Sequence, residues 1–240
     1  TMQVGSGWGG SFCDFHVTSF VACVDLGRGG RSTYSYRAEG SWKVALGEMK
    51  SGGFKHTYVL IQFGHNDQPG KPGRSTNLAT EFPVNLKRYV SETRKAGATP
   101  VLVTPLTRRD FKDGALQDDL QPWAEAVRKV ATEMNVPLVD LHGDSAAAVQ
   151  AMGAAVATRL AEIPPPLDVL VAAEKGTTMA GPDHEPPIPL PPNSDTGPAG
   201  SVKLYFDYTH LSSVGADYFS KIVAEDLAKA VPELRKDLLP

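Results

Sequence analysis

Four short apolar segments, separated by stretches with helical periodicity, constrain the fold of this chain more than any other feature. They are Phe20–Asp25, Tyr58–Phe63, Pro100–Leu106 and Val136–Leu141. Each segment is rich in β-forming residues and has no alternating polar face. This pattern is typical of strands that are buried on both sides in a parallel sheet.

The chain between and after these segments has apolar residues at helical spacing. We expect helices over Ser41–Lys50, Ala79–Ala96, Leu116–Met134 and Ser213–Ala230. The alternation of strands and helices predicts right-handed crossovers and an α/β fold with helices on both faces of a parallel sheet. In such folds ligands bind at the carboxyl ends of the strands, so functional residues are expected in the loops that follow them.

Prolines gather in one part of the chain, since residues 163–200 hold ten of the 19. Proline lacks a backbone donor and fixes φ, so we expect a long irregular surface loop there. A last short strand is expected directly after it, at Val202–Phe206. Because only 40 residues follow position 200, we interpret residues 1–240 as one domain.

Charge and cysteine content argue against several classes of function. The formal net charge is −3, which disfavours a nucleic-acid partner held by phosphate neutralisation. No long apolar run is present, so we expect no membrane-spanning helix, and the opening residues lack the pattern of a signal peptide. Cys13 and Cys23 form either one disulfide or a pair of buried thiols. The histidines show no ligand spacing, so neither a metal nor a cofactor is expected.

Three polar clusters lie where functional loops are expected. Gly27–Ser32 follows the first apolar segment, and its glycines let backbone amides approach a ligand, although they also suit a tight turn. Gly64–Asp67 follows the second segment, and its Asn66 either donates to a developing oxyanion or caps a turn. Asp207 and His210 precede the last helix, where the carboxylate either orients the imidazole as a base or caps the helix.

The three clusters together, read as GGRS, GHND and DxxH, resemble the motifs of the SGNH (GDSL-type) hydrolase superfamily. The stretches VDLGRGGRSTYSYRAEGSW, VLIQFGHNDQPGKPG and FDYTHLSSVGADYF are similar to rhamnogalacturonan acetylesterase-like carbohydrate esterases. The resemblance implies a flavodoxin-like three-layer α/β/α sandwich with a central parallel sheet. It also implies that His210 is the base, that Asp207 orients it, and that Gly30 and Asn66 donate to the oxyanion.

The same resemblance implies a serine nucleophile at the end of the first, central strand. In the family this serine lies a few residues before a Gly-Trp-Gly, which is Gly7–Gly9 here. The expected serine therefore immediately precedes Thr1. We expect an upstream segment to supply the first strand and the serine, because removal of a central strand leaves backbone groups unpaired in the core.

A literal GDS occurs elsewhere, at Gly143–Ser145. In the order of the family this position carries no nucleophile. An alanine-rich run follows it, so we expect Asp144 or Ser145 to cap a helix. His65 is expected to support the site structurally.

The resemblance implies a serine esterase that removes acetyl groups from plant cell-wall polysaccharide such as rhamnogalacturonan or xylan. Its partner is an acetylated polysaccharide or a small ester, and a secreted or periplasmic location is expected. Arg108, Arg109 and Asp110, after the third apolar segment, either contact an anionic or hydroxyl-rich substrate or form a solvated loop. Two alternatives stay open: a protein of this fold that lacks the serine and binds carbohydrate, and a short-chain lipase or thioesterase. The sequence does not determine the oligomeric state.

Overall fold

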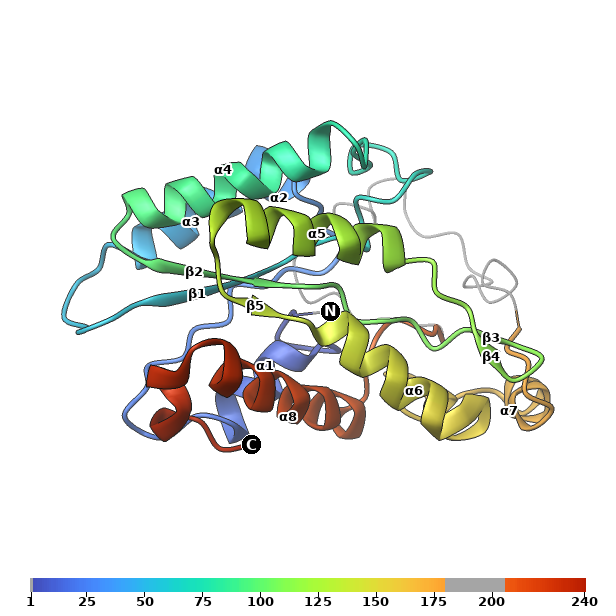
Figure 1. Ribbon diagram of the computed structural model, residues 1–240. Helices are drawn as coiled ribbons and strands as arrows, with labels where there is room; N and C mark the ends of the chain where they lie inside the picture. The colour runs from blue at the N-terminus through green and yellow to red at the C-terminus, as the bar shows by residue number, and fades with distance from the viewer. Residues whose placement is uncertain (1, 180–205) are drawn as a thin grey trace.

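The sheet at the centre of the molecule has three parallel strands. The computed structural model describes residues 2–179 and 206–240. Within them β1 (Tyr58–Gln62), β2 (Thr99–Val103) and β5 (Leu138–Val139) pair in the order β1-β2-β5 (Figure 1). The β1–β2 ladder starts with Tyr58 opposite Thr99. Three of the four strands predicted from the apolar segments are therefore confirmed, each shorter than its segment.

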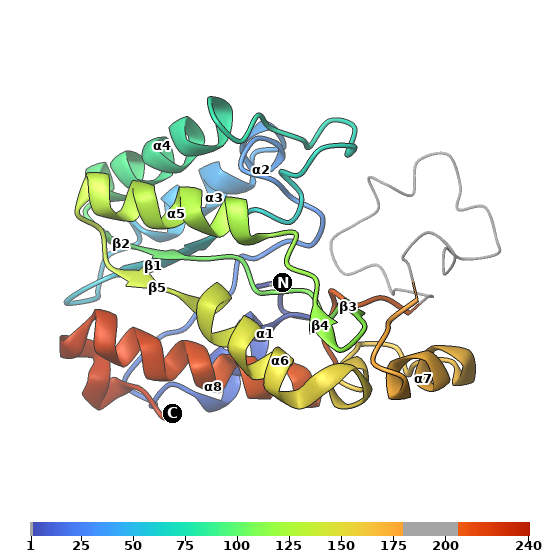
Figure 2. The ribbon, with the colours of Figure 1, turned by 45° about the vertical axis from the view of Figure 1, so that its right-hand side comes forward.

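Helices cover both faces of this sheet. Their bounds are α1 Trp8–Phe15, α2 Ser35–Ala38, α3 Ser41–Glu48, α4 Glu81–Lys95, α5 Gln121–Met134, α6 Leu141–Thr158, α7 Leu167–Glu174 and α8 Ser213–Ala230, with a 3₁₀ helix, η3, at Pro232–Asp237. In Figures 1 and 2, α3, α4 and α5 lie on one face, and α1, α6 and α8 lie on the other. This arrangement is the predicted α/β sandwich with a parallel sheet.

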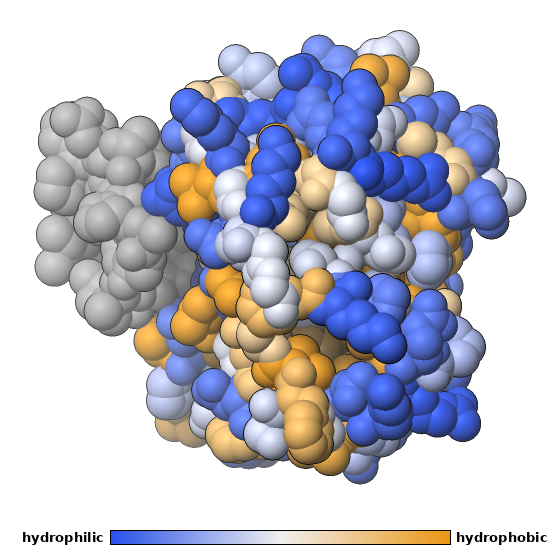
Figure 3. All heavy atoms as spheres, turned by 90° about the vertical axis from the view of Figure 1, so that its left-hand side faces the viewer, coloured by the Kyte–Doolittle hydropathy of each residue, from blue (hydrophilic) through white to orange (hydrophobic). Residues whose placement is uncertain are grey.

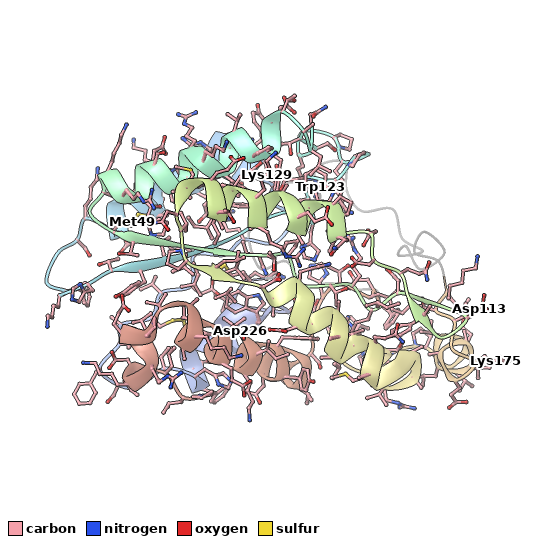
Figure 4. The ribbon with its side chains drawn as sticks, in the orientation of Figure 1. Met49, Asp113, Trp123, Lys129, Lys175 and Asp226 are labelled. Carbon is pink, nitrogen blue, oxygen red and sulfur yellow. A yellow bond between two sulfur atoms is a disulfide. The ribbon has the colours of Figure 1, made fainter. Side chains whose placement is uncertain are left out.

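The apolar faces predicted for α4 and α5 are buried between these helices and the sheet. Phe82, Leu86 and Tyr89 of α4 are fully buried. Trp123 of α5 meets Phe82 edge to face, with ring centroids 4.8 Å apart. Lys129, on another side of α5, has a side chain that is 77% exposed, and Figure 4 labels both residues of this helix. Helical spacing in the sequence therefore identified the buried faces.

The strand predicted at Phe20–Asp25 does not form. The Val21 amide donates to the Thr18 carbonyl in a turn, and the segment then runs as coil that pairs with no described strand. Phe20 is 91% exposed and Val24 is 62% exposed. An apolar, β-forming sequence becomes a strand only beside a backbone that completes its hydrogen bonds. The prediction was wrong because no such backbone adjoins this segment in the described structure.

A cavity of about 1590 Å³ is lined by β1 and by residues 20–31. Since β1 ends the strand order, one of its two edges has no ladder partner among the described residues. The lining of the cavity is mixed, since apolar residues such as Val17, Leu227 and Leu238 share it with charged ones such as Lys55 and Glu233. Figure 3 shows a hollow with apolar side chains gathered around it on one face of the molecule. The central sheet is therefore open beside β1.

A short hairpin, which the sequence did not predict, follows β2. It consists of β3 (Phe111–Lys112) and β4 (Ala115–Leu116). Asp113 and Gly114 between them both have positive φ, 52° and 80°, as a two-residue hairpin turn of type I′ requires. The Gly114 amide donates to the carbonyl of Gly176, just after α7, at 2.8 Å. The hairpin and α7 lie side by side in Figure 2.

The last helix, α8, has the bounds that the sequence predicted. Its first turn is capped by Ser212, whose Oγ accepts from the Gly215 amide at 3.2 Å. The expected strand Val202–Phe206 lies outside the described residues except for Phe206, which is not in a strand.

Part of the proline-rich stretch is helical rather than irregular. Residues 180–200 of it lie outside the described residues, but α7 forms within residues 163–179. Pro166 is the residue that precedes the first turn of this helix. Proline is tolerated there because the first helical amides have no partner within the helix.

A disulfide joins Cys13 of α1 to Cys23, with the two Cα atoms 5.3 Å apart. This finding decides between the two states that the sequence left open. The bridge ties the coil that lines the cavity to α1. None of the described helices is both long enough and apolar enough to cross a membrane.

Candidate active site

The three polar clusters predicted from the sequence all contribute residues to the lining of the cavity. Gly30, Asn66, Asp207 and His210 all line it. Gly30 follows the coil beside β1, Asn66 lies in the loop after β1, and Asp207 and His210 precede α8. The fold therefore gathers residues that are up to 180 positions apart in the sequence.

Asp207 and His210 form a hydrogen-bonded pair. The Asp207 Oδ2 atom lies 2.8 Å from His210 Nδ1. The other carboxylate oxygen, Oδ1, accepts from the backbone amides of Thr209 at 2.9 Å and His210 at 2.8 Å. A carboxylate held in this way fixes the imidazole tautomer with its proton on Nδ1 and directs Nε2 to act as a base. The alternative role of Asp207 as a helix cap is filled by Ser212 instead.

A buried arginine holds the backbone of this turn. Arg109 has no exposed surface. Its Nη2 atom donates to the carbonyl of His210 at 2.7 Å and lies 3.4 Å from that of Asp207, and its amide donates to the carbonyl of Tyr208 at 3.1 Å. Burial lowers the pKa of this guanidinium to about 10. Arg109 thus positions the turn at residues 207–210 instead of lying in a solvated loop, and it does not line the cavity; contact with a substrate and a solvated loop were the two roles expected from the sequence.

Its neighbour Arg108 lines the cavity and connects the turn to the loop after β1. Arg108 Nε donates to Thr209 Oγ1 at 3.2 Å, and Nη2 donates to Gln68 Oε1 at 2.9 Å. Nη1 forms an ion pair with Asp119. Thr209 precedes His210, and Gln68 lies two residues after Asn66. The contacts of Arg108 therefore couple the position of His210 to that of Asn66.

Asp67 serves as a structural clamp between two of the loops. It is fully buried, and its carboxylate accepts from the Thr33 amide at 3.0 Å, from the Thr33 hydroxyl, and from Thr76 Oγ1 at 2.9 Å. Burial raises the pKa of Asp67, although these hydrogen bonds oppose the shift. The clamp fixes the loop that holds Gly30 against the loop that holds Asn66. Sequence reasoning found Asp67 but not its threonine partners.

Gly30 and His65 complete the surroundings of the site. Gly30 has φ of +77°, which favours glycine, and a Cβ built on it would lie 3.4 Å from Arg74 Nη1. His65 is buried, and burial holds the pKa of its imidazole well below the usual value, so the ring is neutral at physiological pH. Its Nε2 atom has no hydrogen-bond partner within the described residues. The structural role expected for His65 remains a prediction.

The GDS sequence at Gly143–Ser145 lies away from this site and inside α6. The helix begins at Leu141 and its N-cap is Asp140, so the prediction that Asp144 or Ser145 caps it was wrong. The helix starts earlier because it follows β5 almost directly. Ser145 is fully buried, and its Oγ accepts from the Thr107 amide at 3.1 Å. It does not line the cavity.

No group of three or more His, Cys, Asp or Glu side chains in the described part of the chain has the arrangement of a metal site. The expectation that the reaction needs neither a metal nor a cofactor stays a prediction. The groups that the sequence motifs bring to the cavity are an imidazole, its carboxylate partner, a side-chain amide and backbone donors.

Comparison with known proteins connects this arrangement to a family. Residues 7–159 match the model of the GDSL-like lipase/acylhydrolase family, a range that includes the Gly30 and Asn66 loops. The chain is 32% identical over 142 residues to a probable rhamnogalacturonan acetylesterase, YesY, of Bacillus subtilis strain 168, covering 59% of this chain and 63% of that protein. It is 33% identical over 156 residues to the rhamnogalacturonan acetylesterase RhgT of the same strain, covering 65% and 64%. The chain thus spans less than two thirds of the length of these curated relatives.

A solved structure has a similar fold over most of the described chain. The crystal structure of protein YXIM_BACsu from Bacillus subtilis aligns with a TM-score of 0.60 and 18% sequence identity. The alignment covers 93% of this chain and 50% of that one. At this level of identity the likeness concerns the fold alone.

Proposed function

Because the chain belongs to the GDSL-like lipase/acylhydrolase family, we propose that it is a carboxylic ester hydrolase that removes acetyl groups from plant cell-wall polysaccharide. The observation that carries this proposal is the 2.8 Å contact between Asp207 and His210 in the cavity that Gly30 and Asn66 also line. A protein that only binds carbohydrate has no need of a base, its orienting carboxylate and two donors in one cavity.

The mechanism is acyl transfer in two steps. A serine hydroxyl gives its proton to His210 Nε2 as its oxygen attacks the ester carbonyl. The Gly30 amide and the Asn66 side chain donate to the oxyanion that forms on the carbonyl oxygen. His210 then gives this proton to the sugar oxygen as its bond to the carbonyl carbon breaks, so the sugar leaves with a free hydroxyl and the acyl group stays on the serine. In the second step His210 takes a proton from a water molecule as that water attacks the acyl-enzyme. His210 then returns this proton to the serine oxygen as the acyl bond breaks and acetate leaves.

The serine in this proposal immediately precedes Thr1, at the end of a strand that occupies the space beside β1. Two observations support this placement. One edge of β1 and the coil at residues 20–25 have no strand partner among the residues that the structure describes. Both line the same cavity, and an inserted strand would give each a partner. Met2 and Gln3 line that cavity, and the amide of Leu211, next to His210, donates to the Ser6 carbonyl at 2.9 Å, so the start of the described chain adjoins the turn that carries the base.

Two observations support an acetylated polysaccharide as the substrate. The two curated relatives are named as rhamnogalacturonan acetylesterases. The described loops around the site carry glycine and charged residues, among them Arg31, Lys71 and Arg108. Such a surface suits a hydroxyl-rich or anionic polymer better than a long acyl chain.

A short-chain lipase or thioesterase is the second candidate, and one observation favours it. Part of the cavity lining is apolar, with Phe12, Val17 and Leu227 among it, and a surface of this kind could accept an acyl chain. The two candidates place different occupants in the same space. They therefore differ in the dependence of the rate on acyl-chain length.

The proposed location is secreted or periplasmic. The Cys13–Cys23 disulfide supports it, because disulfides persist mainly in oxidising compartments.

The test uses the protein expressed with its native upstream residues. Hydrolysis of para-nitrophenyl esters from acetate to octanoate, and release of acetate from acetylated rhamnogalacturonan and acetylated xylan, should be compared. We expect the highest kcat/KM for acetate and its near-complete loss in His210→Ala. A maximum at longer chains would favour the lipase candidate. Binding of polysaccharide with no hydrolysis of any ester would show a carbohydrate-binding protein instead.

A further inference from the structure

Two cationic side chains, Lys71 and Arg74, belong to the cavity that contains the candidate site. Lys71 and Arg74 are half-buried and both line the cavity. Within the described residues neither side chain forms an ion pair or a hydrogen bond. The neighbouring cations differ, since Arg31 is paired with Glu39 and Arg108 with Asp119.

The loop that carries these two cations is fixed in place. Ser75 Oγ accepts from the Lys71 amide at 2.9 Å and donates to the Gln68 carbonyl at 2.8 Å. The Arg74 amide donates to the Lys71 carbonyl at 3.0 Å, and the Thr76 amide donates to the carbonyl of the buried Asp67 at 2.9 Å. These bonds hold the loop without using either charged group. The loop therefore presents both cations in a defined place relative to Asn66.

Arg74 also lies close to a backbone group proposed to take part in the reaction, and Lys71 lines the same cavity. Arg74 Nη1 would be 3.4 Å from a Cβ atom on Gly30, so its guanidinium adjoins the proposed oxyanion donor. An anion held between Lys71 and Arg74 would sit next to the ester undergoing cleavage.

The protein relieves the charge repulsion around Lys71 only in part. Burial lowers the pKa of Lys71 to about 8, and the positive charges of Arg108 and Arg74 act in the same direction. The carboxylates of Asp119 and Asp67 oppose this shift without cancelling it. The buried imidazole of His65 also feels the charge of Lys71, but it is neutral. A bound anion would stabilise the charged form of Lys71 and accept hydrogen bonds from both side chains.

We propose that Lys71 and Arg74 form a carboxylate-binding subsite that takes the uronate group of an acidic polysaccharide next to the acetylated sugar. The inference rests on the proposed esterase function and deepens it by naming the charge of the substrate. The forked guanidinium of Arg74 suits a carboxylate in two-point contact, and Lys71 supplies a second positive charge. The subsite favours acetylated polymers of uronic acids over neutral ones such as unsubstituted acetylated xylan.

The substitutions Lys71→Met and Arg74→Met test the subsite in the protein with its native upstream residues. The substrates are acetylated oligogalacturonides and the same oligosaccharides with their carboxylates methyl-esterified. The ratio of kcat/KM for the acidic substrate to that for the neutral one should fall about ten- to one-hundredfold in each variant, the range for a hydrogen bond to a charged group. Lys71→Arg should restore part of the ratio. Lys129→Met removes the same charge outside the cavity, on α5 (Figure 4), and should leave the ratio unchanged.

The pH dependence gives a second readout. For the wild type, the ratio should decline as the pH rises through about 8, where Lys71 loses its proton, and Lys71→Met should abolish this decline. A ratio that is the same in wild type, Lys71→Met and Arg74→Met would overturn the subsite even if esterase activity is high.

A failure of the proposed esterase function can also be distinguished from a failure of the subsite. If the wild type hydrolyses no ester, the proposed function fails, but calorimetric titration with deacetylated oligogalacturonides still tests the subsite. Binding that is lost in Lys71→Met and with the methyl-esterified oligosaccharide would support it. Equal binding of the acidic and esterified forms would overturn it.

Discussion

The carboxylate of Asp207 contacts His210 twice, through the imidazole Nδ1 at 2.8 Å and through the backbone amide at 2.8 Å. The two carboxylate oxygens of Asp207 thus fix both the side chain and the backbone of His210. This double contact orients the imidazole before any substrate arrives. Arg109 holds the same turn from within the protein by donating to the His210 carbonyl.

Replacing Asp207 with Asn should slow the reaction and change its pH dependence. An amide cannot stabilise the imidazolium and can hold the wrong tautomer, so we expect kcat to fall about 10²–10⁴-fold. The acid limb of kcat/KM should move to lower pH, because a neighbouring carboxylate favours the protonated imidazole. The pH profiles of kcat and kcat/KM for the wild type and for Asp207→Asn measure both effects. A near-normal rate with an unmoved acid limb would exclude the pairing from the mechanism.

Asn66→Ala should lower kcat by about 10²–10³-fold, the usual effect of removing one oxyanion donor. Circular dichroism and thermal unfolding should show an intact fold. The matched control is Asn77→Ala. Asn77 Oδ1 accepts from the amides of Ala79 and Thr80 before α4, outside the cavity. This control should lose about 1 kcal/mol of stability and keep its kcat. An unchanged kcat in Asn66→Ala would remove Asn66 from the oxyanion site.

Ser145→Ala should leave esterase activity near that of the wild type. The substitution deprives the buried Thr107 amide of its acceptor, so the free energy of unfolding should fall by about 1–3 kcal/mol. Urea unfolding and a para-nitrophenyl acetate assay measure the two effects. A loss of activity by several orders of magnitude with the fold intact would make Ser145 the nucleophile.

Asp144→Asn should stabilise the protein at neutral pH. Asp226 on α8 is buried and points toward α6 (Figure 4), and its hydrogen bond with Asp144 raises the pKa of Asp144 to about 6. The ordinary value is about 3.9. The folded state therefore binds the proton more tightly than the unfolded chain, so this group's contribution to stability is greatest in acid and is lost between about pH 4 and 6.

Unfolding by urea at several pH values measures this effect. The variant should gain stability relative to the wild type as the pH rises from about 4 to about 7. Asp113→Asn, at the exposed hairpin turn, is the matched control. A stability difference for Asp144→Asn that does not depend on pH would show that the two carboxyl groups do not share a proton.

The sequence predicted those features that depend on neighbours along the chain. The spacing of Phe82, Leu86 and Tyr89 identified a buried helical face, and the spacing in DxxH placed Asp207 within reach of His210. Both are local patterns, because one turn of backbone brings such residues together.

Features that depend on distant parts of the chain could not be predicted in this way. The segment Phe20–Asp25 has the composition of a strand, but whether it pairs is decided by the backbone beside it. Arg109 looks like a surface arginine in the sequence, and only the packing of the turn at residues 207–210 over it shows that it is buried. Similarly, only the fold shows that Lys71 and Arg74 line one cavity and that neither forms an ion pair within the described residues.

The central claim is that the base His210 activates a serine just upstream of Thr1. The most direct measurement is labelling of the protein, expressed with its native upstream residues, by a fluorophosphonate that reacts with activated serines, followed by peptide mass spectrometry. The account predicts one adduct, on the serine immediately before Thr1, and its loss in His210→Ala. An adduct on Ser145, or on any other residue from Thr1 to Pro240, would contradict it.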